Sequence, residues 1–315
     1  MRIRRSALAF AVPLSVALLV GACSSSSTPS SASSAATDSK NIIVAVGAEN
    51  EYADVLQQIG GKYVHVTAIM SNPNTDPHTY EASSSVAQEI STAQLVIQNG
   101  VGYDTFMNTI EAAASNSARK VIDVQNLLGL PDSTPNPHLW YKPTTMPAVA
   151  AAIAKDLAAI QPAHASYFQS NERTFVNSLA VWDNALAAFK AKHGNTPVAT
   201  TEPVADYMLT AAGANNLTPF TFQANIMNGV DPSPEITAYQ RNLFTQHKVK
   251  VFLYNQQVTS SFTKSFITLA QTNGIPVVGV YETMPTPGYD YQSWMLAEVH
   301  ALQRAVTSKV STEKL

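Results

Sequence analysis

The chain has 315 residues, of which 45% are hydrophobic and 13% are charged, so it can bury a sizeable core in one large domain or two. Its net charge of −3 and the lack of a basic stripe beyond the first five residues argue against a nucleic-acid partner. A single cysteine excludes an intramolecular disulfide, so the fold must be stabilised by its core alone.

The N-terminus has the pattern of a secretory signal. Three arginines precede an apolar stretch, Ala7–Val20, which contains a proline and is shorter than the ~20 apolar residues of a membrane span. The stretch leads into "VGAC", and Cys23 lies where a bacterial lipobox places the residue that is lipidated. We expect a lipoprotein signal peptide over 1–23 and a flexible serine-rich tether over 24–40. An ordinary signal peptide that happens to contain a cysteine is the alternative.

From residue 41 onward, short apolar runs alternate with helical patterns. The strand candidates are "NIIVAVG" (41–47), "YVHVTAIM" (63–70), "QLVIQNG" (94–100), "RKVIDV" (119–124), "PVATT" (197–201), "KVKVFLYN" (248–255) and "IPVVGVYE" (275–282). Strands separated by helices predict βαβ units and mainly parallel sheets. The nearly continuous runs of Val and Ile are typical of strands that are covered on both faces.

A long helix is predicted in the middle of the chain. Residues 163–192 contain no Gly or Pro, and one apolar stripe recurs at helical spacing: Phe168, Phe175, Leu179, Trp182, Leu186 and Phe189. Such a helix has roughly 30 residues and is ~45 Å long. It ends at "HGNTP", which contains the usual stop residues. The expected fold is therefore α/β, with two lobes of mainly parallel sheet flanked by helices (41–165 and 194–315) and one rigid linking helix (166–193).

Four side chains that can bind metals follow predicted strands. They are His78, His138, Glu202 and Glu282, two in each half. Parallel sheets bind ligands at the carboxyl ends of their strands, so these side chains are expected to converge. Two neutral imidazoles and two carboxylates suit a divalent transition metal, because their charge of −2 cancels that of the ion. A proline precedes each histidine and stiffens its approach.

The residues alone leave other interpretations open. Either glutamate can instead cap a helix, because acidic side chains favour that end. The other histidines are interpreted as structural: His65, His164, His193, His247 and His300. "NGVGYDT" (99–105) lacks the third glycine of a dinucleotide loop and is more typical of a turn, and no P-loop, HExxH or GxSxG motif occurs.

Several blocks resemble the solute-binding proteins of zinc and manganese ABC importers. The similar blocks are "DPHTYEASSSVAQEISTAQLVIQNGVGYDTFM", "NPHLWYKPTTMPAVAAAIAKDL", "VATTEPVADYML" and the segment from "PSPEITAYQ" to "VVGVYE". The resemblance covers about residues 41–308. It implies two α/β lobes joined by a rigid helix, with a metal held between them by His78, His138, Glu202 and Glu282.

This chain departs from the family pattern at several positions. Asn136 replaces the usual Asp before the second "PH", and Asp104 stands where Glu is usual. Glu202 stands where many zinc-type members have His, Glu282 stands where Asp is common, and no His-rich acidic loop is present. The ligand set suits Zn²⁺ or Mn²⁺, and the Irving–Williams order favours zinc slightly.

The resemblance implies an extracytoplasmic lipoprotein that captures Zn²⁺ or Mn²⁺ as cargo and delivers it to a membrane permease driven by a cytosolic ATPase. It implies no catalysis, and we expect a monomer anchored to the outer face of the cytoplasmic membrane through Cys23. Two alternatives are a secreted metal-dependent hydrolase and a binder of a larger metal chelate on the same fold. A closed shell of four ligands disfavours the hydrolase, because catalytic zinc keeps an open position for water.

Overall fold

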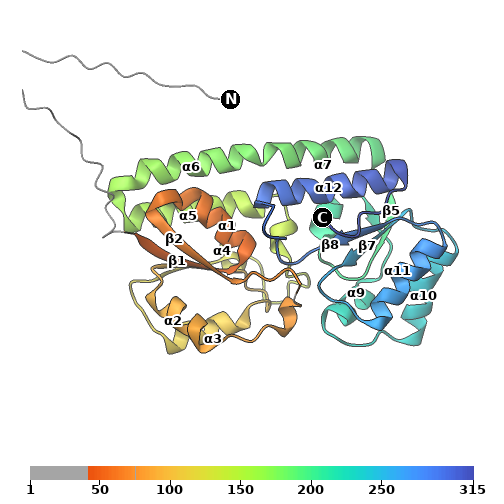
Figure 1. The fold of residues 1–315 in the computed structure, drawn as a ribbon, viewed down its shortest axis with the longest axis horizontal. Helices are drawn as coiled ribbons and strands as arrows, with labels where there is room; N and C mark the ends of the chain where they lie inside the picture. Colours follow the sequence, from red (N-terminus) through yellow and green to blue (C-terminus); the bar gives the residue numbers. More distant parts are fainter. Residues whose placement is uncertain (1–41, 75) are drawn as a thin grey trace, which may run out of the picture. The chain divides into compact units, whose positions relative to one another are not determined.

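The computed structural model describes residues 42–74 and 76–315, and the predicted signal peptide, the tether and Cys23 lie outside them. From residue 42 onward the chain belongs to one compact unit built around two four-stranded sheets (Figure 1). Every pair of adjacent strands in both sheets is parallel, as expected where helices connect successive strands. The predicted α/β class with mainly parallel sheets is confirmed.

The first sheet has the strand order β2–β1–β3–β4. Its strands are β1 (Ile43–Glu49), β2 (Val64–Met70), β3 (Leu95–Gln98) and β4 (Lys120–Asp123). Its helices are α1 (Asn50–Gly60), α2 (Ser84–Thr92), α3 (Thr105–Ala113), α4 (Val124–Leu127) and α5 (Thr145–Ile160), and its 3₁₀ turns are η1 (Gly61–Tyr63), η2 (Pro77–Thr79), η3 (Leu139–Tyr141) and η4 (Pro162–His164). Figure 1 shows α1 and α5 on one side of this sheet and α2 and α3 on the other. All four strands predicted in this half are present.

The second sheet has the strand order β6–β5–β7–β8, so the two halves share one layout. Its strands are β5 (Pro197–Thr200), β6 (Asn215–Asn216), β7 (Val251–Asn255) and β8 (Val277–Val280). Its helices are α8 (Asp206–Ala211), α9 (Phe220–Met227), α10 (Pro234–Thr245), α11 (Ser261–Thr272) and α12 (Tyr291–Ser308). The sequence did not predict β6, because its two asparagines lack the β-branched and aromatic residues that indicate a strand.

The single helix predicted over residues 163–192 is in fact two consecutive helices, α6 (Ala165–Ser178) and α7 (Ala180–His193). Leu179 between them keeps helical dihedral angles, with φ −67° and ψ −18°. Its N–H donates to the carbonyl of Val176, three residues back, as in a 3₁₀ turn, which interrupts the α-helical ladder. Figure 1 shows the two helices running end to end, with α6 over α1 and α5 of the first half and α7 along α12 of the second.

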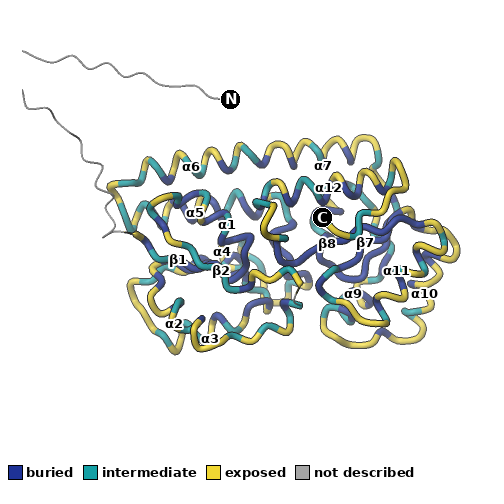
Figure 2. The backbone as a smooth tube through the Cα atoms, in the orientation of Figure 1, coloured by how far each residue is buried: buried dark blue, intermediate teal, exposed yellow. Residues whose placement is uncertain are grey.

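A continuous apolar core connects the two halves. The stripe predicted on the long helix is buried throughout, and its members are Phe168, Phe175, Leu179, Trp182, Leu186 and Phe189. These side chains belong to one cluster that contains the three fully buried tryptophans, Trp140, Trp182 and Trp294, and residues of both sheets. Figure 2 shows the buried side of α6 and α7 alternating with an exposed outer side. Because such cores are close-packed, a large rotation of one half against the other would disrupt many contacts.

Within the part of the chain that the structure describes, no helix is both long enough and apolar enough to cross a membrane.

Candidate metal centre

His78 lies on the loop that follows β2, in the 3₁₀ turn η2. The Asp76 carboxylate accepts the backbone N–H of His78 at 2.9 Å and so begins this turn, with Pro77 at its first position. The His78 side chain is 21% exposed, which makes it the accessible member of the site. It lines a cleft of about 400 Å³, to which Tyr103 contributes from the first half and Met227 from the second.

His138 lies on the loop between α4 and η3 and is completely buried. The side-chain oxygen of Asn136 accepts both the backbone N–H of His138, at 3.0 Å, and a hydrogen bond from its ring Nδ1, at 2.7 Å. The ring of Trp140 packs edge-on against the imidazole, as expected for a side chain that shields it from water. The hydroxyl of the neighbouring Tyr141 donates to the carbonyl of Tyr281.

Glu282 lies two residues after the end of β8 and is the point at which the other groups meet. The ring nitrogens Nε2 of His78 and of His138 each lie 3.1 Å from its Oε2. The three donor atoms lie within 4.8 Å of one another, and this is the one such group of three or more in the described residues. The amide of Asn255, at the end of β7, donates to the other oxygen, Oε1, at 2.6 Å. The hydroxyl of Tyr103 donates to Oε2 at 3.0 Å.

Glu202 follows β5 and is buried, but it does not belong to this close group of three. Neither of its carboxylate oxygens has a hydrogen-bond partner among the described residues. Burial and then repulsion from Glu282 raise the pKa of Glu202 well above its usual value, with a smaller opposing effect from the Asn255 amide. The structure therefore brings three of the four predicted side chains together and leaves the fourth close by, without a partner.

The electrostatics of the group favour two imidazoles facing a charged carboxylate. Burial lowers the pKa of His138, and Glu282 offsets only part of this effect. Burial is the largest single effect on His78 and lowers its pKa, but the combined effects of Glu282 and Asp76 outweigh it, so that the pKa of His78 is raised. Burial would raise the pKa of Glu282, yet the two imidazoles together hold it below its usual value. Nε2 of His78 lies near Glu282 without the geometry of a hydrogen bond.

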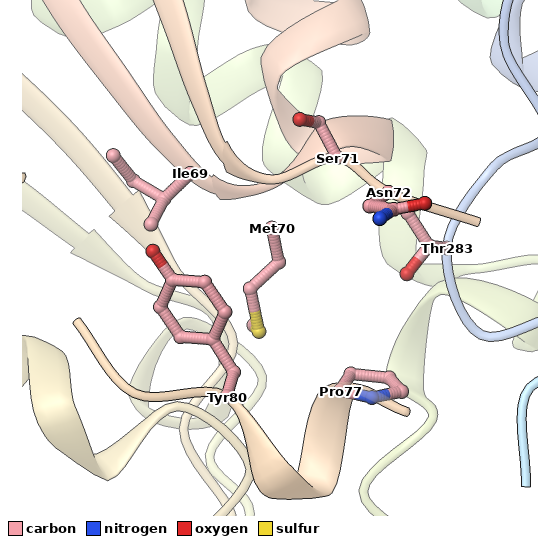
Figure 3. A pocket seen from close by; sticks show the side chains of 7 residues that line it. All are labelled: Ile69, Met70, Ser71, Asn72, Pro77, Tyr80 and Thr283. Atoms are coloured by element: carbon pink, nitrogen blue, oxygen red, sulfur yellow. The ribbon is translucent and has the colours of Figure 1, made fainter. Parts of the chain in front are cut away.

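A cavity of about 200 Å³ lies behind the loop that carries His78. Figure 3 shows Met70 at its centre, Tyr80 and Pro77 on the η2 side and Thr283 opposite. Thr283 follows Glu282 in the chain, so this cavity borders both the His78 loop and the segment that carries the central carboxylate.

Two residues of the site, Tyr103 and Asn255, were not predicted from the sequence. The "NGVG" turn, with Gly100, Val101 and Gly102 all at positive φ, confirms the interpretation of this motif as a turn, and it directs Tyr103 towards the site. The Asp104 carboxylate stabilises the turn by accepting the N–H groups of Asn99 and Gly100. Asn255 is the last residue of β7, so a search of the strand ends for polar side chains, which selected the predicted ligands, could also have identified it.

Comparisons with known proteins agree with this architecture. The manganese-binding lipoprotein MntA of Bacillus subtilis (strain 168) is 26% identical over 140 residues, which are 42% of this chain and 45% of MntA. The chain therefore spans less than half the length of that relative. The manganese ABC transporter substrate-binding lipoprotein PsaA of Streptococcus pneumoniae is 24% identical over 291 residues, 86% of this chain and 87% of PsaA.

Among solved structures, a metal-free mutant of the periplasmic metal binding protein from candidatus liberibacter asiaticus superposes with a TM-score of 0.67. It is 21% identical, and the match covers 84% of this chain and 99% of that one, which shows the same fold. The family model described as "Zinc-uptake complex component A periplasmic" matches residues 46–305. That match includes residues of all eight strands and all four predicted metal-binding side chains, so this chain belongs to the ZnuA family.

Proposed function

We propose that this protein is the extracytoplasmic substrate-binding component of a metal ABC importer and holds one divalent transition metal ion between its two halves. The ligands in this proposal are His78, His138, Glu202 and Glu282. The observation that supports it best is the approach of two imidazole nitrogens to one carboxylate oxygen, each at 3.1 Å. When a neutral imidazole carries its proton on Nδ1, its Nε2 and the carboxylate oxygen face each other with lone pairs, and such an arrangement is stable only around a proton or a metal cation.

Glu202 completes the set in this proposal. A buried carboxylate without a partner is costly, and a metal cation supplies the missing partner. Two neutral imidazoles and two carboxylates would then neutralise a divalent ion. The charge of Glu282 already repels that of Glu202, and a cation bound by both carboxylates would replace this repulsion by attraction.

We favour zinc as the cargo, with manganese as the alternative. Because Asn255 holds Oε1 of Glu282, only Oε2 of that carboxylate faces the imidazoles, so Glu282 would bind through a single oxygen. Ligation by single atoms suits the four-coordinate geometry of zinc, and zinc also ranks above manganese in intrinsic affinity. MntA and PsaA are named for manganese, and the oxygen-rich half of the ligand set is compatible with that ion.

We further propose that Cys23 carries the lipid anchor and that a membrane permease with its cytosolic ATPase receives the metal. The protein would act as a monomer and without catalysis. The predicted boundaries of 41–165, 166–193 and 194–315 remain our description of its two lobes and their connection. Because one apolar core joins the halves, release would depend on movement of the His78 loop, which has a cavity behind it, more than on lobe rotation.

The proposal is tested by titrating Zn²⁺ and Mn²⁺ into metal-stripped protein lacking residues 1–23, in competition with a chelator. His78→Ala and Glu282→Ala are expected to weaken binding strongly. His65→Ala is the matched control, because His65 is exposed on β2 and lies outside the close group of three. If the wild-type protein binds neither ion tightly, or if His65→Ala weakens binding as much as His78→Ala, the proposal is wrong.

A further inference from the structure

Asn136 contacts a proposed metal ligand and, through the same side chain, the opposite half of the protein. We propose that Asn136 is a positioning residue: it fixes the imidazole of His138 with Nε2 towards the metal and ties that ring to the loop that carries Glu202. This inference rests on the proposed function, because it concerns the same metal centre.

The hydrogen bonds of Asn136 determine the orientation of its amide. Its Nδ2 lies 2.8 Å from the carbonyl oxygen of Pro203, which can only accept, so this atom must be the NH₂ group. The remaining atom, Oδ1, is then an acceptor, and it receives the backbone N–H of His138 at 3.0 Å. Both contacts agree on one orientation, and Asn136 is only 7% exposed, so water does not compete readily for either.

This orientation fixes the tautomer of the histidine. Because Oδ1 is an acceptor, the Nδ1 of His138 that lies 2.7 Å away must carry the proton and donate it. In the neutral ring, Nε2 then has the free lone pair, and it faces Oε2 of Glu282. A histidine that binds a metal through one nitrogen usually donates the other N–H to an outer partner, and Asn136 supplies that partner here.

The same amide links two proposed ligands from opposite halves. Pro203 follows Glu202, so a shift of the loop after β5 would be transmitted through Asn136 to His138. The Tyr207 hydroxyl in α8 makes a second link by donating to the backbone carbonyl of Asn136 at 3.0 Å, but this bond does not involve the imidazole. The side chain of Asn136 therefore contacts both the imidazole and the loop, whereas the Tyr207 hydroxyl contacts only the main chain of Asn136.

Three variants of the metal-stripped protein test the inference: Asn136→Ala, Asn136→Asp and Tyr207→Phe. Asn136→Ala removes both contacts of the side chain. Asn136→Asp keeps the acceptor for the imidazole and replaces the donor to Pro203 by a carboxylate oxygen, which the Pro203 carbonyl repels. Tyr207→Phe removes the link to the main chain of residue 136 and leaves the Asn136 side chain intact. Each variant and the wild type would be titrated with Zn²⁺ against a chelator, and the visible absorption spectrum of each Co²⁺-substituted protein would be recorded.

We expect Asn136→Ala to weaken Zn²⁺ binding roughly 10- to 100-fold and to change the Co²⁺ spectrum. Asn136→Asp should restore most of the affinity and the wild-type spectrum, and Tyr207→Phe should match the wild type in both. The positioning role would be overturned if Asn136→Ala and Tyr207→Phe lost equal Zn²⁺ affinity. It would also be overturned if a folded Asn136→Asp protein had a Co²⁺ spectrum altered as strongly as that of Asn136→Ala. Wild-type Zn²⁺ affinity in Asn136→Ala would also overturn it. Failure of the wild type itself to bind Zn²⁺ would instead refute the proposed function and this inference with it.

Discussion

The hydroxyl of Tyr103 donates a hydrogen bond to Oε2 of Glu282 at 3.0 Å, although 179 residues separate the two in the chain. Tyr103 comes from the turn after β3 and Glu282 from the end of β8, so this bond crosses between the halves at the proposed metal centre. Asn255 holds the other oxygen of the same carboxylate at 2.6 Å. Glu282 is therefore fixed at both oxygens, with Oε2 turned towards the two imidazoles.

Removing the Tyr103 hydroxyl should loosen this arrangement. We expect Tyr103→Phe to weaken Zn²⁺ binding roughly tenfold, because groups that orient a ligand contribute this much or more to metal affinity. Chelator competition at pH 7.5 would measure the change. Tyr80→Phe is the matched control, since Tyr80 lines the same cleft but packs its ring on Phe106. Equal affinities for Tyr103→Phe and the wild type would mean that Asn255 alone is sufficient to orient the carboxylate.

The fold and the centre of the site were predictable for one physical reason. Runs of Val and Ile identified seven of the eight strands, and in a parallel sheet the ends of neighbouring strands lie at one edge. That rule selected His78, His138, Glu202 and Glu282, and the structure brings His138 and Glu282 to 3.1 Å from each other. The rule locates strand ends but does not say how far a side chain extends from them, so the sequence did not reveal that Glu202 lies outside the close group of three.

The features that the sequence missed depend on tertiary contacts. The partner of Tyr103 is on the opposite half, and no local pattern distinguishes a tyrosine that orients a ligand from one that fills the core. The interruption at Leu179 has no Gly or Pro to indicate it, so the apolar stripe predicted one uninterrupted helix. The strand β6 is only two residues long and is defined by its pairing with β5.

Metal binding should release protons, and its affinity should fall as the pH is lowered. The pKa of His78 is raised: burial alone would lower it, but the combined effects of Glu282 and Asp76 outweigh burial. A raised pKa means that the metal-free protein still holds this proton above pH 6.5, the usual value, so competition with the metal begins above that pH and increases below it. Glu202 adds to the effect, since burial and repulsion from Glu282 raise its pKa well above normal.

Calorimetric titrations with Zn²⁺ at pH 7 in buffers of different ionisation enthalpy would count the released protons. The expected number is greater than zero in the wild type and smaller in Glu202→Gln. Affinities measured from pH 8 to pH 5.5 should fall with a slope of up to about one logarithmic unit per pH unit for each proton displaced. A flat profile over this range would argue that neither histidine binds the metal.

Glu202 should destabilise the metal-free protein in exchange for metal affinity. Its buried oxygens lack partners and its charge opposes that of Glu282, so Glu202→Gln is expected to raise the free energy of unfolding of the metal-free protein by about 1–3 kcal/mol at pH 8. Added zinc should reverse the order, because a tight site gains about 2.7 kcal/mol when the free metal is 100-fold above Kd. Urea unfolding with and without Zn²⁺ would measure both effects. A less stable metal-free Glu202→Gln protein would mean that the carboxylate has a structural partner.

Glu298 provides a pH-dependent stability that is independent of metal binding. It is fully buried on α12, and burial raises its pKa to about 8, an effect that hydrogen bonds from Trp294 and Tyr141 only partly offset. The folded protein therefore keeps this proton at a pH at which the unfolded chain has lost it. Consequently the stability contributed by neutral Glu298 is complete below about pH 4.5, falls as the pH rises towards 8, and then becomes constant.

Glu298→Gln should remove this dependence, because the amide keeps an oxygen acceptor for Trp294 and does not titrate. The difference in free energy of unfolding between variant and wild type should grow by about 1.4 kcal/mol per pH unit between pH 5 and pH 8, in favour of the variant. Urea unfolding of the metal-free proteins across this range would measure it. Glu235→Gln, an exposed position on α10, is the control and should run parallel to the wild type. Parallel curves for Glu298→Gln and the wild type would show that Glu298 is ionised in the folded protein, in which case its two hydrogen bonds, and not the proton, compensate for its burial.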